Sequence, residues 1–189
     1  MPKLRYLGDA VLRKVCREIR EVTPQIQKIA EELIEIADTH QGAGLAAPQI
    51  GYDIRMFIVC VGEAADKEGH PIAIDPIIYI NPKITKFYKE SCTMAEGCLS
   101  IPGLIEDLER PKYVDIEAFD IHGKPFKEIK VQGWKSRCIQ HEMNHLDGIL
   151  FFDNLPEKVR QGLQTDLDLI EQKYYRMAQL GSSNRLSEL

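Results

Sequence analysis

The sequence predicts an α+β fold, in which helices pack on a mostly antiparallel sheet. Three observations support this: an amphipathic helical pattern near the N-terminus, a middle region of apolar runs separated by turn residues, and two helical patterns in the last third of the chain. The order helix, strands, helix, helix is typical of α+β domains. Neither an internal repeat nor a linker divides the chain. We therefore expect one domain over residues 1–180, followed by a frayed tail over residues 181–189.

The first helix is predicted to begin after Thr23. Thr23 is a typical N-cap, and Pro24 fits the first helical turn. The helix should end at "QGAGLAAPQIG" (41–51), where glycines break the pattern and Pro48 prevents its resumption. Its apolar positions share one helical face: Ile26, Ile29, Ala30, Leu33 and Ala37.

The strands are predicted in the middle of the chain. "RMFIVCV" (55–61) and "IIYINP" (77–82) are apolar runs of strand length, and the proline of the second should end it. The stretch 62–76 between them contains acidic residues, glycine and proline, so we expect a surface excursion. Residues 113–131 are expected to form two strands joined by a turn at 122–123.

Two helices are predicted to follow the strands. The first fits residues 134–147, with Gly148 as its C-terminal stop, and we expect the sheet to pack around this central helix. The second spans residues 155–180 and is amphipathic. Its apolar stripe consists of Val159, Leu163, Leu167, Ile170, Tyr174 and Met177.

The composition argues against several classes of function. The formal net charge is -5, which does not favour wrapping of nucleic acid or docking to an anionic membrane. No apolar run approaches the roughly 20 residues that a membrane-spanning helix needs. The N-terminal stretch lacks the apolar core of a secretion signal, so we expect a cytosolic protein.

The motif "QHEMNHL" (140–146) predicts a metal site. Residues four apart lie one turn apart on the same helical face, so His141 and His145 could bind one ion. Glu142 could reach a water held by that ion and handle its protons. The alternative is a solvated helix face that carries polar residues by chance.

A third protein ligand must come from elsewhere in the chain. The five cysteines are odd in number and contain no CxxC pair, which argues against a disulfide framework or a structural zinc ribbon. Cys98, in "EGCLSIPG" (96–103), is a candidate, because a thiolate there would give a Cys-His-His site with one position open for water. The spacing alone does not select Cys98 over the other cysteines or over a carboxylate.

Three stretches together resemble the peptide deformylases: "GAGLAAPQ" (42–49), "EGCLS" (96–100) and "QHEMNHL" (140–146), in that order. The resemblance covers nearly the whole chain and implies the fold of that family. It also implies a metal-dependent hydrolase that removes the N-formyl group from the N-terminal formylmethionine of nascent polypeptides and releases formate.

The resemblance assigns catalytic roles by matching position. Cys98, His141 and His145 would bind the metal, and Glu142 would be the general base and acid. The side-chain amide of Gln49 and the backbone N–H of Leu99 would donate to the oxygen of the formyl group, which becomes negative during attack. On its own, Gln49 would be read as a surface polar residue. The substrate-binding residues implied by the resemblance are Gly44, Ala43, Met94, Trp134, Arg137 and Cys138.

The substrate-binding residues have plain structural interpretations as well. Ala43 and Gly44 are small enough for an extended peptide to approach the backbone, but glycine there also ends a helix. Trp134 could line a methionine pocket or simply belong to the core. Arg137 could contribute its aliphatic stem to the pocket wall or lie on the surface.

The resemblance also implies a cofactor and partners. The cofactor would be one divalent metal ion, Fe²⁺ in the cell, with Zn²⁺, Ni²⁺ or Co²⁺ able to replace it. The partners would be the N-formylmethionyl ends of nascent chains, in the cytoplasm of a bacterium. Weak ribosome contact through the last helix is a further implication, although equal numbers of acidic and basic residues after position 154 favour a packing role. No membrane contact and no direct nucleic-acid recognition are expected.

Two positions depart from the family pattern. Asn144 stands where an aspartate is usual, and we expect it to face away from the metal with catalysis retained. Ile105 stands where many relatives carry an arginine near the peptide path. Two other functions remain as alternatives: a zinc endopeptidase, although no histidine follows the motif to complete its ligands, and an inert binder of formyl-peptide ends.

Overall fold

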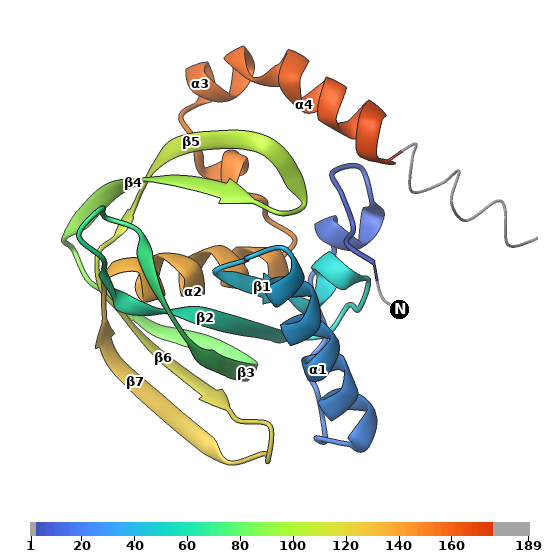
Figure 1. Ribbon diagram of the computed structural model, residues 1–189, viewed down its shortest axis with the longest axis vertical. Helices are drawn as coiled ribbons and strands as arrows, with labels where there is room; N and C mark the ends of the chain where they lie inside the picture. Colours follow the sequence, from blue (N-terminus) through green and yellow to red (C-terminus); the bar gives the residue numbers. More distant parts are fainter. Residues whose placement is uncertain (1–2, 176–189) are drawn as a thin grey trace, which may run out of the picture.

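The computed structural model describes residues 3–175 (Figure 1). Its elements, in chain order, are η1 (Ala10–Arg13), α1 (Pro24–Thr39), β1 (Gly44–Ala46), η2 (Ala47–Ile50), β2 (Met56–Ala65), β3 (Pro71–Phe87), β4 (Ser91–Cys98), β5 (Ile101–Pro111), β6 (Val114–Phe119), β7 (Pro125–Val131), α2 (Gly133–Leu146), η3 (Phe151–Asn154), α3 (Glu157–Gly162), α4 (Gln164–Ile170) and η4 (Glu171–Tyr175). No helix within this range is long and apolar enough to cross a membrane.

The architecture confirms the predicted α+β class. All strand pairs in the two sheets are antiparallel: five strands in the order β1-β2-β3-β6-β7, and the separate pair β4-β5. Helix α2 lies between these two layers and packs on β1 and β2 (Figure 1). The helix that contains "QHEMNHL" is therefore central, as predicted.

Burial of apolar side chains fixes α2 against the five-stranded sheet. Ile139 and Leu146 of α2 are fully buried in a cluster with Phe57 and Val59 of β2 and Tyr79 of β3. Each such side chain contributes roughly 1.5–3 kcal/mol by leaving water. On the opposite side of α2, Arg137 donates to Cys92 of β4 and Leu108 of β5, and His141 contacts Glu96 of β4.

The strand β3 corrects the prediction of a short strand ended by Pro82. It runs from residue 71 to residue 87 through Pro76 and Pro82. Proline has no N–H to donate, but both prolines lie where the register shifts, against β2 and β6 respectively. Residues 62–76 lie on the surface, as predicted, because most of them are exposed and none is buried. They are not an irregular excursion, however, because they extend β2 and β3 into a hairpin that turns at 66–69.

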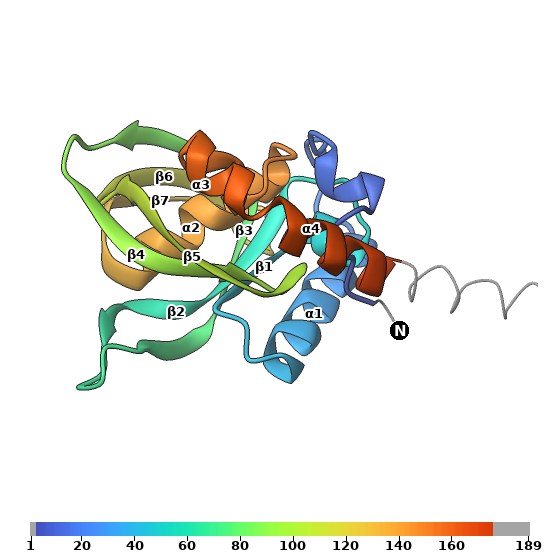
Figure 2. The same ribbon diagram turned by 90° about the horizontal axis from the view of Figure 1, so that it is seen from above.

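The C-terminal part is less regular than the single helix predicted for residues 155–180. It consists of α3, α4 and the π-helical turn η4, and α4 packs against β5 on the side away from α2 (Figures 1 and 2). Leu163, Leu167 and Ile170 pack in the cluster that contains Leu104 and Leu108 of β5, so the predicted packing role is confirmed for them. Met177 and the predicted tail at 181–189 lie outside the described residues.

Candidate metal centre and substrate cavity

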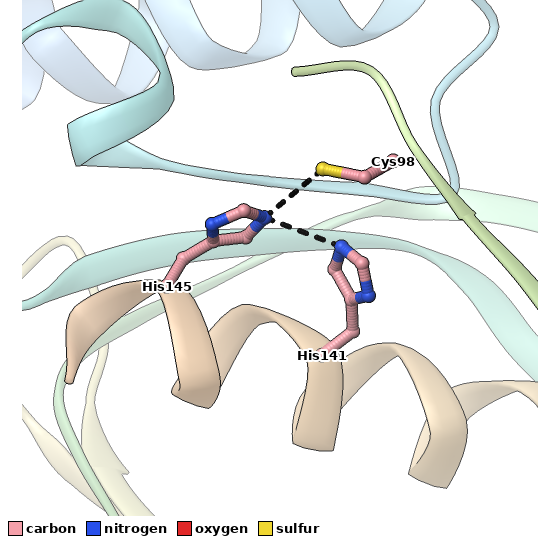
Figure 3. A group of neighbouring side chains, drawn as sticks. All are labelled: Cys98, His141 and His145. Atoms are coloured by element: carbon pink, nitrogen blue, oxygen red, sulfur yellow. Dashed lines mark hydrogen bonds between the residues drawn. The ribbon is translucent and has the colours of Figure 1, made fainter. Parts of the chain in front are cut away.

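Three predicted ligands converge between the two layers. Successive turns of α2 present His141 and His145, and Cys98 ends β4 above them (Figure 3). The donor atoms all lie within 4.8 Å of one another: Nε2 of His145 is 3.2 Å from Sγ of Cys98 and 3.2 Å from Nε2 of His141. Two imidazole nitrogens and a thiolate aimed at one point fit a divalent transition metal, which would accept lone pairs that otherwise face each other.

Glu96 orients His141 from behind. Its Oε1 lies 2.7 Å from Nδ1 of His141, so Nδ1–H donates to the carboxylate and Nε2 remains free for a metal. The carboxylate also accepts from Nη2 of Arg110 at 2.6 Å and Nη1 of Arg137 at 3.3 Å. Burial opposes ionisation of Glu96, but the hydrogen bonds from Arg110 and His141 outweigh it and hold its pKa well below its usual range.

Arg137 is a buried structural cation as well as part of the cavity wall. It is only 4% exposed, which contradicts the surface alternative. Its guanidinium donates to the carbonyl oxygens of Leu108 and Cys92, each at 2.8 Å, and thereby holds β4 and β5 over α2. Its side chain contributes to the cavity lining, as the other alternative expected.

Glu142 lies beside the ligands with one oxygen uncommitted. Its side chain is 3% exposed, and Oε2 has no hydrogen-bond partner among residues 3–175. Burial raises the pKa of Glu142 to about 7, and the charge of Glu96 adds to the rise. A carboxyl group with this pKa, facing a cavity, can accept and release a proton near neutral pH.

Gln49 is fixed with its donor toward the site. Its Oε1 accepts from the backbone N–H of Ala46 at 2.8 Å, and its Nε2 faces Ser100 Oγ at 3.2 Å and Cys98 Sγ at 3.5 Å. Gln49 is buried, so its interpretation as a surface polar residue is wrong. Leu99 follows Cys98 in the turn between β4 and β5 and also lines the cavity.

Cys98, His141 and Glu142 open onto a cavity of about 650 Å³, whereas His145 is not among its described lining residues. Ala43, Gly44, Trp134 and Cys138 line it, as predicted for substrate-binding residues. Met94 is half-buried on β4 and is absent from the described lining residues, so its predicted contact with methionine gains no support from the geometry.

Gly44 occupies a position that no side chain could share. A Cβ there would collide with Sγ of Cys138 and would lie 2.9 Å from Oε1 of Glu142 and 2.8 Å from the carbonyl oxygen of Ile58. Glycine therefore keeps the backbone of β1 close to Glu142, at the wall of the cavity.

Asn144 belongs to the charge network behind the metal centre. Its Oδ1 accepts from Nη1 of Arg110 at 2.8 Å and from Nδ2 of Asn154 at 3.0 Å. Asn144 thus supplies Arg110 with a neutral acceptor. Glu96 and Arg110 are not predicted from the sequence, where the place of Glu96 within "EGCLS" is the signal that points to it.

Comparisons with known proteins agree with this geometry. The family model of polypeptide deformylase matches residues 1–161. A peptide deformylase of Picosynechococcus is 41% identical over 157 residues, which is 83% of this chain and 80% of that protein. The crystal structure of a peptide deformylase from Ehrlichia chaffeensis superposes with a TM-score of 0.81 at 31% identity, covering 92% of this chain and 98% of the other. That of peptide deformylase 1B from Arabidopsis thaliana gives a TM-score of 0.81 at 30% identity, covering 93% of each chain. The chain therefore belongs to the polypeptide deformylase family, the metal-dependent hydrolases that remove the N-formyl group from the N-terminal methionine of nascent polypeptides.

Proposed function

We propose that Cys98, His141 and His145 hold the one divalent metal ion of this deformylase and that Glu142 transfers the protons of the reaction. The observation that carries the proposal is the convergence of three donor atoms within 4.8 Å beside a buried carboxylate with a free oxygen. When bound, the metal would lower the pKa of a water and polarise the formyl group.

The protein's own groups then have distinct tasks. Glu142 accepts a proton from the attacking water and delivers it to the departing amine, so that formate and a free N-terminus result. Gln49 Nε2 and the backbone N–H of Leu99 donate to the oxygen that becomes negative during attack. Removing one such donor typically lowers kcat by about 10²–10³-fold.

The methionine side chain is proposed to lie against Trp134, Cys138 and the stem of Arg137. All three line the cavity, and Ala43 and Gly44 bring the edge strand β1 within reach of an extended peptide. Met94 is retained only as a predicted neighbour of this pocket.

The roles of the metal ligands and of Glu142 can be tested together. The native enzyme, purified without oxygen, should contain about one metal ion per chain and release formate from formyl-Met-Ala-Ser. Glu142→Ala should keep the metal, but its rate of formate release should fall by at least about 10²-fold. Cys98→Ala should lose both the metal and formate release. Glu157→Ala, at an exposed position of α3, is the matched control and should resemble the native enzyme. A Glu142→Ala variant with native activity would contradict the proposal.

The metal is proposed to be Fe²⁺ in the cell, with Zn²⁺, Ni²⁺ and Co²⁺ as substitutes. A thiolate and two imidazoles favour these ions over Mg²⁺ and Ca²⁺, which prefer oxygen ligands. Iron is chosen on the family resemblance alone. Metal analysis of enzyme purified without oxygen from its natural source should find iron; zinc alone would contradict this assignment.

The cytoplasm of a bacterium is proposed as the location, because nascent formylated chains are the substrate. Weak ribosome contact is proposed through α3, where Lys158 and Arg160 are exposed. Co-sedimentation with ribosomes should then decrease when both residues are replaced by glutamate. Equal co-sedimentation of the two forms would contradict the contact.

A further inference from the structure

The cavity continues beyond the metal centre into an apolar part, which we call the outer subsite. Its lining residues are Leu4, Tyr6, Pro102, Leu104, Ile105 and Tyr174. We propose that the outer subsite binds an apolar side chain from one of the two residues that follow formylmethionine, so that Ile105 and Tyr174 determine the sequence preference of the enzyme. This inference rests on the proposed assignment of the metal centre.

Ile105 connects the outer subsite to the metal centre. It lies opposite Gly97 in the register of β4 and β5, and Gly97 is the residue that precedes Cys98. Its Cγ1 is 3.3 Å from the point where a Cβ on Gly97 would lie, so the side chain covers this glycine. At 67% exposed, Ile105 retains a large apolar surface that a bound side chain could remove from water.

Tyr6 is fixed by the two segments that contain Gln49 and Leu99, the proposed donors to the formyl oxygen. The backbone N–H of Arg5 donates to the carbonyl oxygen of Gln49 at 2.8 Å, and that of Leu7 donates to Ser100 at 2.9 Å. Tyr6 lies between these two bonds, with its ring in the cavity wall. The N-terminal segment is therefore attached directly to the active site.

Tyr174 completes the wall from the other end of the chain. Its ring packs on that of Tyr6, with centroids 5.0 Å apart at 32°. It belongs to the π-helical turn η4, and such turns are frequent at functional sites. Gly8, with φ +97, allows the approach of η4, because a Cβ there would lie 2.8 Å from Glu171 Cγ. Figure 2 shows the end of α4 beside the N-terminal segment.

The charges of the cavity favour an apolar occupant. The six residues of the outer subsite are uncharged. The acidic and basic side chains elsewhere in the cavity lining are Glu96, Arg137, His141 and Glu142, which are buried, and His40, which is exposed. An aspartate of the peptide would meet no cation among the six residues of the outer subsite, whereas a leucine would bury apolar surface. Side chains alternate in direction along an extended peptide, so only one of the two residues after methionine can enter the outer subsite.

The test compares four peptide amides: formyl-Met-Leu-Ser, formyl-Met-Asp-Ser, formyl-Met-Ala-Leu and formyl-Met-Ala-Asp. At one of the two positions, kcat/KM of the native enzyme should be about tenfold higher with leucine than with aspartate. Ile105→Ser and Tyr174→Ala should each reduce this ratio to about twofold. Ile129→Ser and Leu169→Ala are matched controls, because both residues are 59% exposed and neither lines the cavity; they should keep the native ratio.

Two results would overturn the outer subsite: a ratio near one at both positions, or a native ratio in both subsite variants. Calorimetric binding of the same peptides to metal-loaded Glu142→Gln separates this proposal from that of the metal centre. Tighter binding of the leucine peptide without formate release by the native enzyme would support the outer subsite and contradict the catalytic assignment. Release from all four peptides without discrimination would contradict the outer subsite alone.

Discussion

Glu96 determines which nitrogen of His141 faces the metal position. It can do so because Arg110 and Arg137 balance its charge inside the protein. Asn144 adds a neutral acceptor to Arg110, where the resemblance to the deformylases implies a carboxylate. At this scale the departure is mild, since the charge on Glu96 already pairs with Arg110 and Asn144 supplies an oxygen at hydrogen-bond distance.

Replacing Asn144 by the expected aspartate tests how much this position contributes to catalysis and metal binding. Asn144→Asp should raise kcat/KM by less than about tenfold, because the residue contacts neither metal nor substrate. Asn144→Ala should weaken metal binding by about 10–100-fold, since Arg110 then loses an acceptor and Glu96 is less firmly held. Kinetics and metal titration of the three forms provide the measurement. A gain of several orders of magnitude in Asn144→Asp would show that the native network is defective.

Glu142 should make the metal-free protein less stable at high pH. Burial raises its pKa from the ordinary 4.5 to about 7 in the folded state, so its contribution is fully present below pH 4.5 and is lost as pH rises through about 7. Between pH 5 and pH 8 the loss should be about 2–3 kcal/mol. Urea unfolding of metal-free native protein and Glu142→Gln, from pH 5 to pH 8, measures it: the stability difference between them should change by this amount. A stability difference that does not change with pH would contradict the raised pKa of Glu142.

At the scale of elements, the hairpin of β2 and β3 supports one wall of the cavity. Trp134, in the first turn of α2, donates from Nε1 to the carbonyl oxygen of Gly69 at the hairpin tip, at 3.2 Å. Gly133, with φ +61, lets the start of α2 approach the carbonyl of Glu63 closely. The hairpin thus holds the tryptophan ring that the methionine side chain is proposed to contact.

Removing the indole donor should therefore affect substrate binding more than turnover. Trp134→Phe keeps an aromatic ring but leaves Gly69 without this donor, which should raise KM for formyl-Met-Ala-Ser by about threefold to tenfold with little change in kcat. Hydrogen exchange at residues 66–71 should also become faster. His70→Ala changes an exposed side chain of the same tip and is the control. An unchanged KM would show that the hairpin does not position Trp134 for substrate binding.

The sequence predicted those elements whose patterns are local. The helices α1 and α2 follow from their apolar faces and stop signals. The proposed metal ligands and Glu142 follow from the motifs that resemble those of the deformylases. The extent of β3 could not be predicted, because bulges accommodate its prolines only when neighbouring strands are present. The Glu96 network joins β4, β5 and α2, so no spacing in the sequence reveals it.

At the scale of the whole molecule, the proposed metal centre lies where separate layers meet. Cys98 comes from the β4–β5 layer, whereas His141 and His145 come from the helix that packs on the five-stranded sheet. A metal ion bound to all three would therefore connect the two layers. Ligand binding that is restricted to the folded state stabilises that state by mass action.

Metal removal should consequently lower the stability of the entire fold. At a free metal concentration 100 times the Kd, binding contributes about 2.7 kcal/mol, and a domain of this size should lose about 5–10 °C in Tm when the metal is chelated. Calorimetry before and after chelation, without oxygen, measures the loss, and re-addition of the metal should reverse it. Cys98→Ala removes the link from the β4–β5 layer, so its Tm should respond to metal much less. A Tm of the native enzyme that does not respond to metal would contradict this coupling, because an ion that leaves gives up its bonds to both layers, and hydrogen bonds such as those of Arg137 and Glu96 then hold β4 and β5 to α2 at this place without it.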